Sequence, residues 1–469
     1  MMAAQAQLDV GGILRPQGSP DLSVALQPYS QTLGERGAAH LLRRAGFSGT
    51  PQEVQRYAAM RAGDAAGTLL ALPSPHSVAP PPEALVNGPL ARHQVRESLS
   101  ALQLWWLNRM LATPAPLQEK MTLYFHGHFT SRATGRFPRI TYNQNALFRD
   151  YATGNLRELT RAVSKDAAML VFLDGANNVA EHPNENYARE LMELFTLGVD
   201  NYTEEDVRES ARAWTGWRVD RRGDRVFFNP RLHDDGRKIF LGRTGDFTGD
   251  DIVDIIFDHA QCSRFFATSL LNFFVYNDPE PELVDRVAEL IHRHNYELAP
   301  VLGTLFASNV FYSRRAYRAL VKSPVEFVVG TYKTLGLSAV NESALAALQQ
   351  MGQQLFFPPS VAGWPGGQNW LTSSTMIARQ NFLTRLLGSQ TLAASSWLHG
   401  LPLAPANAAQ MLGDRLLQGD VAPASLFELE GYLSGTGSEA LASLSVENYD
   451  QRVSGAVYLT MATPAYQLN

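Results

Sequence analysis

Two carboxylates three positions apart, Glu190 and Glu193, lie in the stretch NENYARELMELFTLG at residues 184–198. Paired carboxylates act as general acid and base, or bind a divalent cation, when neighbouring groups hold them in place. Arg189 and Asn186 flank the pair and supply a cation and an amide. These four residues are therefore the first candidates for catalysis, and Glu190 is also a candidate metal ligand.

The helix that positions these side chains is predicted over residues 184–198, with Asn184 as its N-cap and Gly198 as the glycine that ends it. At about 100° per residue, Glu190 falls at the edge of the apolar face, whereas Glu185 and Arg189 point into water. A carboxylate at such an edge is partly desolvated and requires a partner. An arginine of a neighbouring helix is one candidate partner, and a functional role as acid, base or metal ligand is the other explanation.

Exposed helix pairing explains the other charges of this stretch. Arg189 stands four positions from both Glu185 and Glu193, and each i,i+4 pair contributes about 0.2–0.5 kcal/mol on an exposed helix. Glu190 is then the residue that such pairing leaves unexplained.

Two histidines, His126 and His128, stand two positions apart in FHGHF. On an extended backbone they would converge on one metal ion, but on a continuous helix they lie about 200° apart. A continuous helix turns His128 toward the core and His126 away from it, whereas a helix that ends at Gly127 reverses that arrangement.

A third group of candidates follows in the motif HDDG, where His233 and Asp234 precede Gly236. An Asx turn closed by Gly236 explains this motif structurally. The alternative is that its side chains join the same cleft as the other candidates, with Asp234 in catalysis. A divalent metal is then the expected cofactor, and its candidate ligands are His126, His128, Glu190 and His233.

Other kinds of chemistry find no motif in the chain. There is no GxSxG elbow, no phosphate-binding GxxxxGK[ST] loop and no HExxH pair. With 40 Lys and Arg against 45 Asp and Glu, the net charge of -5 predicts no nucleic-acid partner. Trp364, in the Pro- and Gly-rich segment PPSVAGWPGG, is a candidate anchor for a protein partner, although packing is the commoner role of such a residue.

Helical periodicity dominates the 469 residues, so we predict a mainly α fold with a small β-hairpin insertion near residues 217–242. The predicted organisation has three parts. Residues 1–36 form an irregular arm, residues 37–388 the main helical domain, and residues 389–469 a C-terminal helical segment packed on it. The longest apolar run, residues 167–173, is too short to cross a bilayer.

The compartment is left open by the sequence. A single cysteine, Cys262, excludes an intrachain disulfide, and the first residues show no basic region followed by an apolar one. The chain as read is expected in the cytoplasm, and it is expected to be exported if its start has been trimmed.

Several motifs in order resemble the bacterial domain-of-unknown-function family numbered eighteen-hundred. They are LLRRAGFSGTP, FHGHF, NENYARELMELFTLGVDNYTEEDVRESARAWTGW, HDDGRKIFLG, KSPVEFVVG, PPSVAGWPGG and YLTMATPAYQ. The resemblance marks signature residues without giving them roles. It also implies a partner, because members are often exported and encoded beside a sulfatase-like family numbered fifteen-oh-one. The signature positions are His126, His128, Asn184, Glu185, Asn186, Arg189, Glu190, Glu193, His233, Asp234, Lys238 and Trp364.

Two hypotheses about function follow from these residues. The first is a partner-binding or assembly module, in which the signature residues form a polar core network and Trp364 anchors the partner. The second is a metal- or carboxylate-dependent hydrolase that uses Glu190, Glu193, His128 and His233. Whether the protein is an enzyme stays open at the level of sequence.

Overall fold

The computed structural model describes residues 21–71, 81–82, 92–133, 138–220, 225–388, 404–418, 421–435 and 446–469. Segments distant in sequence share two compact units: unit 1 contains residues 1–65, 307–353 and 366–469, and unit 2 contains residues 66–306 and 354–365. The three-part division made from sequence stays a prediction. Residues 1–20 of the expected arm and residues 389–403 lie outside the described residues.

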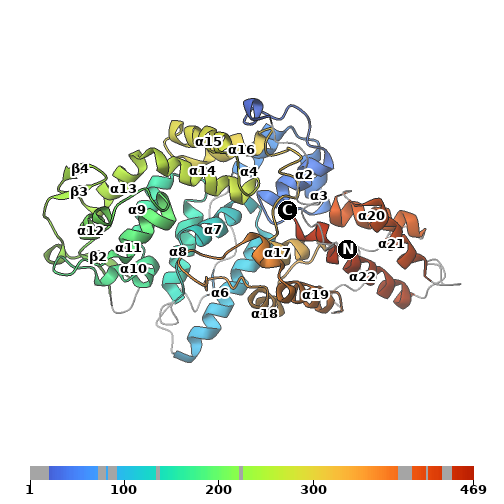
Figure 1. Cartoon of the computed structure of the whole chain (residues 1–469). Helices are drawn as coiled ribbons and strands as arrows, with labels where there is room; N and C mark the ends of the chain where they lie inside the picture. Colours follow the sequence, from blue (N-terminus) through green and yellow to red (C-terminus); the bar gives the residue numbers. More distant parts are fainter. Residues whose placement is uncertain are drawn as a thin grey trace, which may run out of the picture. The chain divides into compact units, whose positions relative to one another are not determined.

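The mainly α prediction is confirmed, because helices follow one another through both units and strands are few and short (Figure 1). Unit 2 contains α6 (Arg92–Ala112), α7 (Pro116–His128), α8 (Pro138–Asp150), α9 (Leu156–Ser164), α10 (Ala167–Phe172), α11 (Glu185–Glu190), α12 (Glu204–Ala213), α13 (Gly249–Asp258), α14 (Ala260–Phe274), α15 (Pro281–Arg293) and α16 (Leu298–Ala307), whose last residue belongs to unit 1.

The helices of unit 1 come from both ends of the chain and from its middle. They are α2 (Gly34–Arg44), α3 (Pro51–Ala58), α17 (Pro324–Thr334), α18 (Ser343–Gln350), α19 (Ser373–Gly388), α20 (Pro405–Leu417), α21 (Pro423–Ser434) and α22 (Val446–Ala462), and α4 (Ala62–Leu70) begins in unit 1 and ends in unit 2. In the described part of the chain, no helix combines the length and apolar character that a membrane crossing requires.

Capping boxes begin several of these helices. The Thr203 hydroxyl accepts the backbone N–H of Asp206 at 3.2 Å, and the Asp206 carboxylate accepts the N–H of Thr203 at 2.8 Å. Thr248 and Asp251 make the same exchange at the start of α13. Both boxes satisfy backbone donors that the first turn of a helix leaves without partners.

Two hairpins take the place of the one predicted hairpin. β1 (Trp217–Val219) pairs antiparallel with β2 (Val226–Phe228), and β3 (Lys238–Phe240) pairs with β4 (Arg243–Gly245). The second turn passes through Leu241 and Gly242, both at positive φ. This turn reverses the chain directly after β3, so strand pairing continues three residues beyond the predicted boundary at residue 242.

Candidate functional site

The predicted single helix at residues 184–198 is wrong in its second half. Asn184 caps α11 as expected, with its side chain accepting the N–H of Asn186 at 3.0 Å. From Leu191 to Thr196 the chain winds as a π-helix (η4), in which the N–H of Leu197 donates to the carbonyl of Met192 at 2.8 Å. π-Helical turns are rare and are found frequently at functional sites.

The wider winding changes the charge pairs that a regular helix predicts. Arg189 donates to Glu185 at 3.3 Å, as expected, but its main partner is Glu204 of α12, at 2.7 and 2.8 Å. The predicted pair between Arg189 and Glu193 is wrong. Since the π-helix begins one position after Glu190, the regular i,i+4 spacing is lost, and Glu193 accepts the Tyr202 hydroxyl at 2.7 Å instead.

Glu190 is half-buried and makes no hydrogen bond or ion pair with any residue that the structure describes. An arginine partner from a neighbouring helix is therefore not found among those residues. Burial raises the pKa of Glu190, the charge of Glu193 raises it further, and Arg189 opposes both effects. Asn186, one turn earlier, is exposed.

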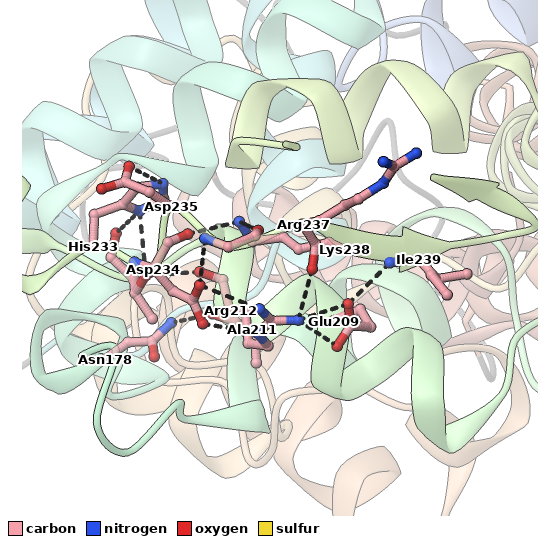
Figure 2. Close-up of polar contacts among 12 residues, drawn as sticks. Asn178, Glu209, Ala211, Arg212, His233, Asp234, Asp235, Arg237, Lys238 and Ile239 are labelled. Carbon is pink, nitrogen blue, oxygen red and sulfur yellow. Dashed lines mark hydrogen bonds and ion pairs between the residues drawn. The ribbon is translucent and has the colours of Figure 1, made fainter. Parts of the chain in front are cut away.

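The HDDGRK motif forms a dense polar network with α12 (Figure 2). Arg212 donates to both carboxylate oxygens of Asp234, at 2.7 and 3.2 Å, and to both oxygens of Glu209, at 2.8 and 2.9 Å. The buried Lys238 donates its ammonium protons to the carbonyls of Asp234 at 2.6 Å and Gly236 at 2.9 Å. These charged groups satisfy one another and fix the loop onto the helix.

Carboxylates of α12 also hold the backbone of the second hairpin. The N–H of Ile239 donates to Glu209 at 2.9 Å, and the N–H of Leu241 donates to Asp206 at 2.7 Å. One helical turn separates the two acids, and two residues separate the two donors. The signature segment from α12 to β3 is therefore a structural clamp in which acidic side chains bind strand N–H groups.

The HDDG motif takes the Asx-turn form. The N–H of Gly236 donates to the Asp234 side chain at 2.8 Å. The Nδ1 of His233 contacts the carbonyl of Thr215 at 2.9 Å, which places its proton on Nδ1. Asp235 is exposed, with a carboxylate oxygen 4.0 Å from the other ring nitrogen.

His126 is buried, which corrects the expectation that a continuous helix turns it outward. α7 does continue through Gly127 to His128. However, residues 354–365 cover His126, whose Nε2 accepts the N–H of Phe356 at 3.0 Å. The rings of Trp106 and Trp364 lie 5.5 and 5.3 Å from the imidazole. Trp364 is thus half-buried as part of an internal aromatic cluster.

His128 occupies a separate apolar environment on the other side of the same helix. Its Nε2 donates to the carbonyl of Phe195 at 2.9 Å, and the rings of Tyr124, Phe129 and Phe266 surround it. One ring nitrogen of each histidine is therefore occupied by backbone. Among the described residues, no group of three or more His, Cys, Asp or Glu side chains is placed to hold a metal ion, so the metal-site prediction gains no support.

Acid is expected to destabilise the protein through these two histidines. Burial lowers the pKa of His126 to about 3 and that of His128 to about 4. Below pH of about 6.5 the unfolded chain protonates both rings while the folded protein does not, so stability falls as pH drops from about 6.5 to 4. The slope approaches about 1.4 kcal/mol per pH unit for each histidine.

Urea unfolding of wild type and His128→Gln between pH 7.5 and 4.5 measures this effect. Glutamine keeps an N–H for Phe195 but does not titrate, so the variant should lose about one proton from the slope. The comparison matters because burial raises the pKa of Asp166 to about 6, which gives a slope of the opposite sign in the same window. Equal slopes for the two proteins would contradict the assignment.

A buried ion cluster in unit 2 was not predicted from the sequence. Glu119, at 0% exposure, accepts from Arg109 at 2.5 Å and from Arg149 at 2.7 and 2.9 Å. The indole of Trp106 donates to the same carboxylate at 2.9 Å, which links the cluster to His126. The one sequence signal was a charged pair, Glu119-Lys120, within an otherwise apolar helix.

A model of the family described as "Protein of unknown function (DUF1800)" matches residues 40–468 of the chain. The chain belongs to this family. The resemblance inferred from the motifs is thereby confirmed over nearly the whole sequence. No curated protein and no solved structure matches the chain.

Proposed function

We propose that this protein is a partner-binding module whose contact face is the helical hairpin of α11, η4 and α12. Most signature charges near this hairpin are bound within the chain. Arg189 pairs with Glu204, Arg212 with Asp234, and Lys238 with backbone carbonyls. Such a satisfied network supports a rigid surface better than it supports groups that must rearrange around a substrate.

Glu190 carries this proposal. A half-buried carboxylate is costly unless a donor or cation meets it, and the described residues supply none. A basic side chain of a partner would compensate that cost, and its charge would lower the raised pKa of Glu190. Val199, 63% exposed at the turn of the hairpin, offers an apolar contact on the same element.

The partner class comes from the family resemblance, which implies a sulfatase-like protein of the family numbered fifteen-oh-one. Trp364 is half-buried against His126, so a role as second anchor for the partner stays a prediction. In this proposal its main contribution is to hold residues 354–365 on α7.

Binding to the purified sulfatase-like protein tests the proposal. We expect Glu190→Gln to weaken the affinity at least about tenfold, which corresponds to about 1.4 kcal/mol. Glu205→Gln is the matched control, because Glu205 is an exposed acid of the same hairpin that pairs with Arg208. Affinities that are equal in wild type and Glu190→Gln would overturn the role of Glu190. A wild type that does not bind would overturn this partner class.

A carboxylate-dependent hydrolase is the second candidate, because a raised pKa suits Glu190 to act as a general acid. In its metal-dependent form, protein purified without chelator would carry bound metal, and Glu190→Ala and His128→Ala would lose it. A wild type free of metal contradicts that form. Turnover that Glu190→Gln does not affect contradicts the carboxylate form.

A further inference from the structure

Unit 1 buries several cationic side chains close to the end of the chain. Removing a charge from water costs several kcal/mol unless an opposite charge or several hydrogen bonds compensate it. Buried cations are therefore almost always found with a counter-ion. The buried cations of this cluster are Arg43, Arg44, Arg318, Lys322 and Arg379.

Lys322 and Arg379 lie together against the last residues of the chain. Arg379 donates to the carbonyl of Lys322 at 2.7 Å and to the side chain of Gln467 at 3.1 Å. The Lys322 ammonium lies 3.9 Å from the centre of the Tyr466 ring. It is 7% exposed and has no hydrogen-bond acceptor among the described residues.

The remaining cations approach the same segment. Arg318 donates to the carbonyl of Ala465 and, at 2.5 Å, to that of Leu417 at the end of α20. Arg44 donates to the carbonyl of Asn469 at 3.2 Å. Arg318 holds this position with φ at 53°, a left-handed conformation that costs about 1–3 kcal/mol for a residue other than glycine.

The charges of this cluster do not balance. Glu326 is the half-buried carboxylate whose charge acts on Arg44, Lys322 and Arg379. Burial lowers the pKa of Lys322 well below its ordinary value, and the charges of Arg43, Arg318 and Arg379 lower it further. Burial also lowers the pKa of Arg379 to about 10 and, with Arg43, that of Arg44 to about 9. Cations that repel one another in this way are stabilised when an anion enters.

We propose that unit 1 contains an anion site in which Lys322 and Arg379, supported by Arg43 and Arg318, bind a tetrahedral oxyanion such as a phosphate or sulfate group. Guanidinium groups present forked donors that match such oxyanions, and an ammonium adds a compact charge. The unpartnered ammonium of Lys322 is the donor left for the ligand.

The competing explanation is structural, because the same cations bind carbonyls of residues 465–469 and could serve to hold that segment alone. The two explanations differ in the role of the Lys322 ammonium. If it only packs on Tyr466, its charge is dispensable and no anion depends on it. If it belongs to an anion site, the response to the anion requires it.

Titration calorimetry of the full chain with sodium sulfate, at constant ionic strength set by sodium chloride, decides between them. We expect sulfate to bind the wild type and Lys322→Met to bind it at least about tenfold more weakly. Removing one of several repelling charges should leave Lys322→Met folded in the absence of sulfate. Lys333→Met is the matched control, since Lys333 is a buried lysine of α17 that pairs with Glu53 at 3.1 Å.

Sulfate does not titrate near neutral pH, so a proton taken up on binding reports on the protein. Because an anion raises the lowered pKa of Lys322, binding should take up protons, and the apparent enthalpy should change with the ionisation enthalpy of the buffer. Absence of sulfate binding in wild type, or equal binding in wild type and Lys322→Met, would overturn the proposal. Inorganic phosphate, tested in the same way, shows whether the site prefers one oxyanion.

Discussion

Replacing Glu119 by glutamine is expected to lower the free energy of unfolding by about 3–5 kcal/mol, the cost of leaving buried charges without their partner. The Glu119 carboxylate binds the guanidinium groups of Arg109 and Arg149 and the indole of Trp106. Burial alone would raise the pKa of Glu119, but the two arginines outweigh burial and lower it. The folded protein therefore depends on the ionised form.

Urea unfolding at neutral pH measures this loss, and Glu158→Gln provides the control. Glu158 pairs with Arg161 at 2.6 Å, but its side chain is exposed, so its removal should cost no more than about 0.5–1 kcal/mol. Equal effects of the two variants would show that Glu119 does not act as a counter-ion to buried cations.

Substituting alanine for Gly363 is expected to destabilise the protein by about 2–4 kcal/mol, from backbone strain and steric overlap together. Gly363 has φ at 78°, and a Cβ atom there would lie 2.6 Å from the carbonyl oxygen of Gly127 and 3.2 Å from the Thr130 hydroxyl. Residues 354–365 would have to move away from α7, and the cover over His126 would move with them.

Gly242→Ala separates strain from overlap. Gly242 has a similar φ of 74°, but nothing lies within 4 Å of the position of its Cβ. Thermal unfolding of this variant should therefore show only the strain, about 1–2 kcal/mol. If Gly363→Ala is no worse than Gly242→Ala, residues 354–365 do not pack on α7 as described.

Local patterns predicted the elements that local forces determine. The caps at Asn184 and Thr203 and the Asx turn at Asp234 each depend on groups within three residues of one another, and all three are present. The π-helix from Leu191 was missed because a projection at 100° per residue assumes regular α winding. The pair predicted for Glu193 failed for the same reason.

Other features depend on contacts between distant segments. The residue that covers His126 is Phe356, 230 positions further along the chain, and no helical period records such a contact. Glu119 likewise meets Arg149 30 positions away. The unbalanced cations around Lys322 come from three separate segments of the sequence, and the net charge of -5 conceals them.

Hydrogen exchange of the chain, free and in complex with the sulfatase-like protein, tests most directly whether the hairpin of α11, η4 and α12 is the contact face. We expect amides of residues 185–213 to gain protection on binding and Glu190→Gln to abolish this gain. A complex that forms with unchanged affinity in Glu190→Gln, and that protects other residues while leaving 185–213 unaltered, would contradict this assignment of the contact face.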